Sequence, residues 1–275
     1  MVDAGLNVAR LDFAHGTHAE HAATIAAIRH VSNELGVPLG VLQDLPELHV
    51  HSDAPKAAHL AFGLEHDVDW VAIPFVRNAS EVLRVKRFVA AYGRNVPVIA
   101  KIEKPEALDA IDEIIAAADG ILVAPGDLGM EMPPGRIPSV HRDIVALANR
   151  ASKPAISAAP RHEPAISLQR TAGVDVVIDI IDGTDAVMLW AEPECDSTSL
   201  EAVRIVAELA RATKCRYPHE ELRARRMASA ARTIDTASAE EATMTGTICS
   251  CATSSREHRR EMPRAGSHRS APARA

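Results

Sequence analysis

Short β-type runs recur along this sequence at intervals of roughly thirty residues, and alanine-rich segments with helical periodicity separate them. Runs that are apolar throughout, and that alternate with helices, are typical of a parallel sheet buried on both faces. The pattern therefore predicts either a doubly wound sheet or a (β/α)8 barrel. The seven runs are Val8–Phe13, Leu39–Asp44, Trp70–Phe75, Val96–Ile102, Gly120–Ala124, Pro154–Ala158 and Ala186–Trp190.

Helix-start signals support this alternation. Thr17 with Glu20, and Asn78 with Glu81, have the spacing of an N-cap residue and the acid three residues later. Pro105 suits the first turn of another helix. Each signal follows one of the β-type runs, as a βα unit requires.

Bulk composition narrows the class of protein. Charged residues make up 24% and hydrophobic residues 47%, which is ordinary for a globular chain. A net charge of -7 argues against nucleic acid as a partner. No apolar run reaches the ~18 residues of a membrane helix, the N-terminus lacks a signal-peptide pattern, and the four cysteines lack metal-ligand spacing. We expect a cytoplasmic protein with no membrane partner.

The composition changes near the C-terminus. Residues 227–275 contain no Phe, Trp, Tyr or Lys and are rich in Ala, Ser, Thr and Arg. Such a segment buries too little apolar surface to offset its ordering entropy, so disorder is expected. We therefore predict a barrel over residues 1–223 and a low-complexity, disordered tail over 224–275.

Four of the predicted strands end in residues that can carry chemistry. In parallel α/β folds the working groups lie at the carboxyl ends of the strands and in the loops that follow. Lys101 and Glu103 are two residues apart, so they share one face of their strand. The full set is Arg10, Asp12 and His15, then Asp44, then Lys101 and Glu103, and finally Gly126 and Asp127.

Glu103 and Asp127, on adjacent strand ends, are the residue types that bind a hard cation such as Mg²⁺ (or Mn²⁺). Lys101 beside them would supply positive charge to a developing anion. Gly126 would let a ligand approach the backbone at a helix start. Singly, each signal is weak, because Lys-x-Glu is commonly a surface ion pair and Gly-Asp-x-Gly commonly a turn.

Longer motifs carry a resemblance to the pyruvate kinase family over Asn7 to about Arg223. The clearest are N-V-A-R-L-D-F-A-H-G at 7–16, A-K-I-E-K-P-E-A at 100–107, D-G-I-L-V-A-P-G-D-L-G-M-E-M-P at 119–133 and D-G-T-D-A-V-M-L-W-A-E at 182–192. The segment Phe62–Val76 and the run Ser199–Val203 also resemble family segments. The resemblance implies a TIM-type barrel, here with only seven recognisable strands.

The same resemblance implies a phosphotransferase of glycolysis, which moves a phosphoryl group from phosphoenolpyruvate to ADP and gives pyruvate and ATP. Lys101 would be the catalytic residue, and Arg10, Gly126 and Asp127 would bind substrate. Glu103 and Asp127 would hold Mg²⁺. A K⁺ site would fall at Asp12 and Asp44.

Several positions depart from the family pattern. Asp12, Ala14 and Leu45 replace oxygen-bearing residues linked to the K⁺ site, which predicts weakened K⁺ binding. Ala159 replaces a threonine linked to proton transfer, and Pro125 replaces an arginine. We interpret His15 as a structural hydrogen-bonding residue. The changes predict a fold that is better preserved than its chemistry.

Larger pieces of the family pattern are missing. The inserted lid domain is deleted near 44–46, the first strand should precede Met1, and the tail replaces the C-terminal domain. Seven strands would leave open edges at Val8 and Val187, or edges bridged by residues around Thr245–Cys249; the open edge is the main prediction, with marginal stability or self-association as its result.

We therefore predict a pyruvate kinase-like phosphotransferase with impaired activity. Within enzymes, the alternative is a Mg²⁺-dependent enolate lyase or aldolase acting on pyruvate-like acids. In a different class, the alternative is a non-catalytic protein: a pseudoenzyme, a subunit that partners a complete homologue, or a decayed fragment. The macromolecular partner that we consider is a second copy of the chain or a complete homologue.

Overall fold

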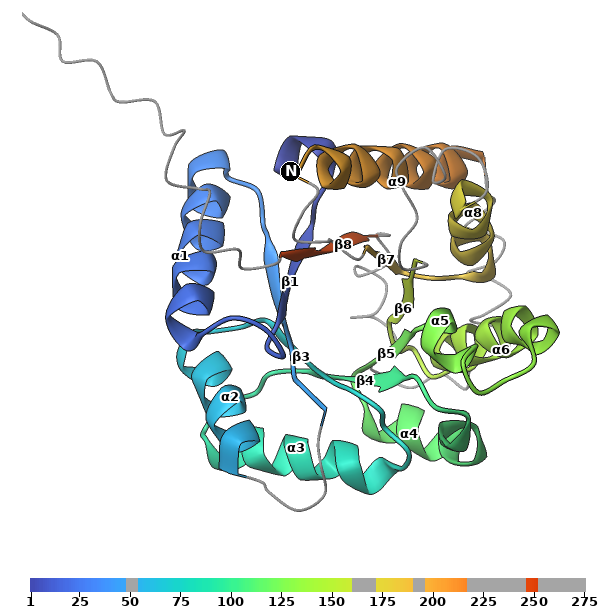
Figure 1. Ribbon diagram of the computed structural model, residues 1–275, viewed down its shortest axis with the longest axis horizontal. Helices are drawn as coiled ribbons and strands as arrows, with labels where there is room; N and C mark the ends of the chain where they lie inside the picture. The colour runs from blue at the N-terminus through green and yellow to red at the C-terminus, as the bar shows by residue number, and fades with distance from the viewer. Residues whose placement is uncertain (48–53, 160–171, 190–195, 217–245, 252–275) are drawn as a thin grey trace, which may run out of the picture.

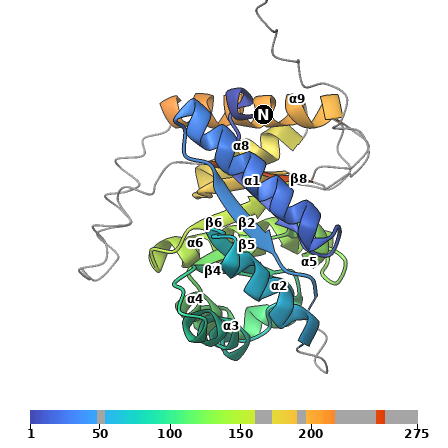
Figure 2. The same ribbon diagram turned by 90° about the vertical axis from the view of Figure 1, so that its left-hand side faces the viewer.

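The structure is a computed structural model and describes residues 1–47, 54–159, 172–189, 196–216 and 246–251. Its strands form a parallel barrel in sequence order, and the last strand closes it against the first. Figure 1 shows the strands at the centre with helices around them, and Figure 2 shows the same arrangement from the side. The strands are β1 (Val8–Asp12), β2 (Gly40–Asp44), β3 (Trp70–Ile73), β4 (Val98–Ile102), β5 (Gly120–Val123), β6 (Ala155–Ala158), β7 (Ala186–Leu189) and β8 (Gly246–Cys251).

Helices follow the strands and cover the outside of the barrel (Figure 1). The α-helices are α1 (His18–Leu35), α2 (Ala54–Glu65), α3 (Ala79–Ala91), α4 (Ile111–Ala117), α5 (Pro125–Leu128), α6 (Ile137–Arg150), α8 (Ala172–Asp182) and α9 (Asp196–Arg216). Short 3-10 helices lie at η1 (Val2–Ala4), η2 (Pro105–Ala110) and η3 (Pro134–Arg136). In the described part of the chain, none of these helices combines the length and apolar character needed to cross a membrane.

The predicted helix starts are confirmed. Thr17 caps α1 with a full capping box, since its hydroxyl accepts from the Glu20 backbone N–H and Glu20 accepts from the Thr17 N–H. The Asn78 side chain caps α3 by accepting from the Glu81 N–H at 3.2 Å. Pro105 opens η2.

All seven predicted strands are present, so the TIM-type α/β architecture is confirmed. Four boundaries differ from the prediction by one residue, and two differ by two residues. β3 ends at Ile73, two residues before the predicted end, and β4 begins at Val98 after Pro97, which cannot donate a ladder hydrogen bond. Trp190, the predicted last residue of the seventh strand, lies outside the described residues.

The prediction of an open barrel edge is wrong. β8 pairs in parallel with both edge strands, with Ile248 in register with Val8 and Thr247 in register with Val187. The strand overlaps the segment 245–249, which is the alternative prediction for bridging the gap, and it lies between β7 and β1. Composition alone did not reveal it, because pairing on two sides satisfies the backbone of a short strand whatever its side chains. The rest of the predicted tail, 224–245 and 252–275, lies outside the described residues.

The core has two layers set by the alternation of side chains along the strands. One set fills the barrel interior, and the other packs between the strands and the surrounding helices. The interior cluster contains Leu42, Ala72, Ile99, Leu122, Ala124, Ile156, Ala158 and Met188. The larger outer cluster includes Leu11, Val41, Val71, Ala100, Ile121 and Ile144. Apart from aromatic Phe13, Phe62 and Phe88, side chains in and against this outer cluster are mainly aliphatic.

Candidate active site

Strand parity directs a set of charged side chains to the carboxyl end of the barrel interior. Lys101 has the same parity on β4 as the interior residue Ile99, and Asp44 the same parity on β2 as Leu42. Arg10 follows Val8 on β1 in the same way. The strands β1, β2 and β4 therefore end in charged residues that face a common point inside the barrel.

These side chains form one network of ion pairs. Asp44 Oδ2 accepts from Arg10 Nε at 2.6 Å and from Lys101 Nζ at 3.1 Å. Lys101 Nζ also lies 3.1 Å from Glu103 Oε1. One carboxylate oxygen of Asp44 thus binds two cations at once, and Lys101 is fixed between two carboxylates.

The network is buried, and its charges balance. Arg10, Asp44, Lys101 and Glu103 are all no more than 5% exposed, with two cations opposite two anions. Burial alone would lower the pKa of Lys101, but the carboxylates of Asp44 and Glu103 outweigh it and the pKa is raised. Lys101 is therefore a permanent cation at neutral pH.

Glu103 has the opposite balance. Burial raises the pKa of its carboxyl, and the charge of Lys101 and the Phe75 backbone N–H offset this only in part. The Phe75 N–H donates to Glu103 Oε2 at 2.9 Å. Each oxygen of Glu103 therefore has one donor and keeps a further lone pair for a cation.

Asp12 stands at the rim of the network. Its Oδ2 lies 3.2 Å from Arg10 Nη2, and its Oδ1 accepts from the Ala14 N–H at 3.0 Å. Burial would raise the pKa of Asp12, but the Arg10 guanidinium outweighs it, so the pKa is lowered. Asp12 is thus an anion attached to Arg10.

One buried carboxylate oxygen in this network accepts no hydrogen bond in the described structure. Asp44 Oδ1 is inaccessible and has no hydrogen-bond partner in the described structure, although Oδ2 of the same carboxylate has two. An unpartnered buried oxygen is costly unless something binds it. Its chemistry, that of a hard oxygen ligand, fits a cation held with Asp44, such as the predicted K⁺.

The loop after β5 carries Gly126 and Asp127 at the same end of the barrel, in the short helix α5. Asp127 is partly exposed, and its backbone N–H donates to the Ala124 carbonyl at 3.2 Å. A Cβ added to Gly126 would meet no atom within 4 Å, so the protein leaves space beside this residue. The part of the chain that the structure describes contains no group of three or more His, Cys, Asp or Glu that could hold a metal. A joint Glu103–Asp127 site therefore stays a prediction.

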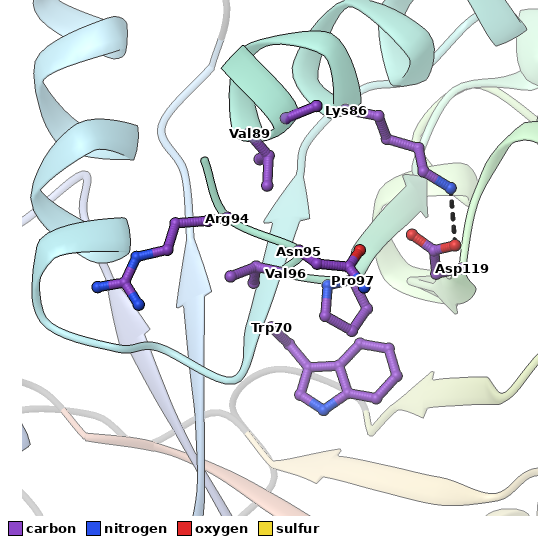
Figure 3. A pocket seen from close by; sticks show the side chains of 9 residues that line it. Trp70, Lys86, Val89, Arg94, Asn95, Val96, Pro97 and Asp119 are labelled. Carbon is purple, nitrogen blue, oxygen red and sulfur yellow. Dashed lines mark hydrogen bonds and ion pairs between the residues drawn. The ribbon is translucent and has the colours of Figure 1, made fainter. Parts of the chain in front are cut away.

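A cavity of about 540 Å³ lies at the opposite end of the strands (Figure 3). Trp70 and Pro97, at the starts of β3 and β4, line it together with Lys86, which is ion-paired with Asp119 at 2.7 Å. None of the predicted site residues lines this cavity. The charged network and the cavity are therefore separate places.

Comparison with known proteins decides the family. The family model described as the barrel domain of pyruvate kinase matches this chain in two pieces, residues 1–56 and 47–203. This chain belongs to the pyruvate kinase family.

Curated pyruvate kinases give the same result. Pyruvate kinase 2 of Synechocystis sp. is 29% identical over 311 positions, which cover 76% of this chain and 53% of that protein. The pyruvate kinase of Agrobacterium vitis is 38% identical over 189 residues, covering 67% and 38%. That of Thermotoga maritima is 38% identical over 155 residues, covering 55% and 33%. The chain spans about half the length of the first of these relatives and a smaller share of the other two.

The departures from the pyruvate kinase pattern follow the carboxyl ends of β1, β2, β5 and β6. Ala159 is buried after β6 and its backbone N–H donates to the Met188 carbonyl at 2.8 Å, but it has no hydroxyl. Leu45 is buried in the outer core, and Ala14 is exposed. Pro125 is the first residue of α5, where its ring suits the helix start.

His15 lies in the loop between β1 and α1. Its backbone carbonyl accepts from His21 Nε2 at 2.9 Å, while its own ring is 82% exposed and 3.6 Å from Asp12 Oδ2. The structural contact is thus made by the backbone of His15 rather than by its ring.

Two features of the site were missed from the sequence. The sequence predicts a cation at Asp44, whereas Asp44 binds Arg10 and Lys101; the shared strand parity of the three residues is the signal for this contact. Phe75 was not assigned at all, although it positions Glu103 through its N–H from a backbone with φ of 50°. Nothing in the sequence signals that conformation, which is unusual for a bulky residue.

Proposed function

We propose that this chain is a pyruvate kinase-like phosphotransferase with impaired activity, acting on phosphoenolpyruvate and ADP. Family membership supports the reaction class, and one observation supports the site: Lys101 is held as a buried cation at the carboxyl end of the barrel. Phosphoryl transfer depends mainly on positioning and charge neutralisation, which fixed cations supply.

Each residue of the network has a role in this proposal. Arg10 contacts the phosphate of phosphoenolpyruvate, and Lys101 stabilises the moving phosphoryl group and the enolate oxygen left behind. Gly126 and Asp127 face the substrate carboxylate. Glu103 and Asp127 are the residues that would hold Mg²⁺ (or Mn²⁺), which when bound neutralises phosphate charge.

The reaction balances as one transfer and one protonation. The bond between the enol oxygen and phosphorus breaks, and a new bond forms to the terminal phosphate oxygen of ADP. The enolate then takes a proton at its methylene carbon to give pyruvate. Ala159 offers no hydroxyl for that proton, so water must deliver it, and a lost acid–base group typically costs about 10²–10⁴-fold in rate.

Two further observations support impairment. Arg10 and Lys101 are both ion-paired with Asp44, so a substrate anion must compete with an internal carboxylate. The family match breaks into two pieces that overlap at 47–56, as a deleted lid domain near 44–46 would produce. A lid that closes over bound substrates excludes water and completes the site.

The test is a coupled assay in which pyruvate formation consumes NADH through lactate dehydrogenase. We expect turnover close to background, together with Mg²⁺-dependent binding of oxalate, which imitates the enolate of pyruvate. Lys101→Met and Asp127→Ala serve as controls. Turnover at the level of a complete family member, lost in both variants, would contradict impairment. The absence of both turnover and oxalate binding would contradict the enzyme proposal and leave the non-catalytic alternative.

A further inference from the structure

Two histidine rings face each other between the first two helices. His18 is the first residue of α1, and His59 lies in α2. His18 Nε2 and His59 Nδ1 are 2.8 Å apart, and both residues are partly exposed. Figures 1 and 2 place α1 and α2 beside one another on the outside of the barrel. This histidine pair lies outside the charged network of the candidate active site.

Packing fixes both rings. His18 stacks on Phe62, with ring centroids 4.3 Å apart and an angle of 20°, while Phe13 meets the ring of His59 edge-on at 5.7 Å. The His59 backbone carbonyl also accepts from Gln43 Nε2 at 2.6 Å. The capping box at Thr17 holds the helix turn that carries His18. Neither nitrogen needs a large movement to meet a shared ligand.

The surroundings favour a neutral ring at His59. Burial lowers the pKa of His59, and the neighbouring rings of His18 and His21 lower it further. Neutral imidazole is the form that binds transition metals. At neutral pH His59 therefore offers a nitrogen lone pair without first losing a proton.

We propose that His18 and His59 form a two-histidine site for Zn²⁺ or a similar divalent transition-metal ion that cross-links α1 to α2. Tetrahedral zinc with Zn–N bonds of 2.0–2.1 Å places its two nitrogens about 3.3 Å apart, so the pair needs to open by only about 0.5 Å. In the described residues no third His, Cys, Asp or Glu completes the group. Water fills the remaining positions.

Protons are conserved in this step. In the metal-free pair one facing nitrogen carries the shared proton and the other accepts it. When the ion binds, each ring keeps one proton on its outward nitrogen, which is Nδ1 of His18 and Nε2 of His59. Neither outward nitrogen is among the buried atoms without a hydrogen-bond partner. Binding therefore needs a change of tautomer on one ring and no net release of protons.

The first test measures thermal unfolding of the full chain with and without ZnCl₂. At a hundredfold excess over the dissociation constant, Zn²⁺ should raise the unfolding midpoint by roughly 5–10 °C. His18→Gln and His59→Gln should each remove most of that shift. The matched control is His30→Gln, an exposed histidine on α1, which should keep it. The control is needed because the chain has 13 histidines.

Two outcomes would overturn the site: no Zn²⁺ shift in the wild-type chain, or a shift that survives both His18→Gln and His59→Gln. Mg²⁺ at equal concentration should give no shift that depends on these histidines, because it prefers oxygen ligands. That arm separates this site from the proposed Glu103–Asp127 site.

If the variants fold poorly, imidazole ¹⁵N spectra of the wild-type chain decide the question. Zn²⁺ must then move His18 Nε2 and His59 Nδ1 together. If those two resonances stay unchanged, the site does not exist.

Discussion

Lys101 Nζ, near the end of β4, donates to Asp44 Oδ2, at the end of β2, over a distance of 3.1 Å. The same oxygen accepts from Arg10. Asp44 thus occupies the position between two cations that an anionic substrate would also seek. A single carboxylate therefore holds the site together and competes with its substrate.

Replacing Asp44 by Asn should make the fold less stable but should strengthen the binding of anions. Removing one partner from a buried ion-pair network should lower the free energy of unfolding by roughly 3 kcal/mol. The variant keeps Arg10 and Lys101, so phosphate or oxalate should bind more tightly than to the wild-type chain without Mg²⁺. Urea unfolding and calorimetric titration measure the two effects. Asp67→Asn, at an exposed residue, is the control and should alter neither. Weaker anion binding in Asp44→Asn would contradict the competition.

The proposed Mg²⁺ site predicts a specific loss. At Mn²⁺ concentrations that the wild-type chain binds, Asp127→Ala should abolish most of the binding. A hard cation held by two carboxylates loses half its protein ligands in this variant. Electron paramagnetic resonance of free Mn²⁺ measures the bound fraction. Glu106→Ala removes an exposed carboxylate close by and should leave binding intact. Equal Mn²⁺ binding in both variants would place the ion elsewhere.

A second buried network predicts how stability depends on pH. Burial, with Asp175 and Asp182 nearby, raises the pKa of Asp179 to about 7, and burial lowers that of His141 to about 4. The two side chains lie 3.4 Å apart, and His141 Nε2 lies 2.8 Å from Ser157 Oγ.

The raised pKa of Asp179 stabilises the fold below about pH 4, and this contribution is lost as pH rises to about 7. The lowered pKa of His141 acts oppositely, since its contribution is present above pH 6.5 and is lost as pH falls toward 4. Of these two groups, Asp179 makes the larger change between pH 6 and 8, because most of the His141 contribution is already present at pH 6.5.

Asp179→Asn should therefore flatten the decline in unfolding free energy between pH 6 and 8, a decline of about 1 kcal/mol in the wild-type chain. Urea unfolding at several pH values measures it. Asp143→Asn, at an exposed residue of the helix that carries His141, should leave the decline unchanged. A wild-type decline that persists in Asp179→Asn would assign it to another group.

Barrel closure predicts what the last strand contributes. A chain ending at residue 245 lacks β8 and exposes the edges of β1 and β7, so it should unfold at lower temperature and self-associate. A chain ending at 251 keeps the strand and is the matched control. Ile248→Pro tests the same point, because proline removes a backbone donor within β8. Calorimetry with light scattering measures both effects. Equal behaviour of the chains ending at 245 and 251 would show that β8 does not stabilise the barrel.

The sequence predicted the strands of the barrel because their apolar runs and helix caps are local signals. Thr17 and Asn78 begin helices for reasons contained within four residues. β8 could not be predicted in this way, because Gly246–Cys251 becomes a strand only through partners far away in the chain. In the candidate site too, local signals could be predicted and contacts between distant residues could not. Strand ends identified Arg10, Asp44, Lys101 and Glu103, whereas the Asp44–Lys101 contact depends on how β2 and β4 align across β3, which lies between them.

The pairing of β8 with β1 also affects how the protein is made. Val8 and its partner Ile248 are 240 positions apart in the sequence. A ribosome must therefore release the residues between β1 and β8 before β1 can pair with β8, and loop closure over such a distance is slow. Until then the edge of β1 is an exposed template for other chains. The nascent protein should accordingly depend on chaperones, and shortening the chain at its C-terminus should reduce the yield of folded protein more than a substitution of similar cost elsewhere.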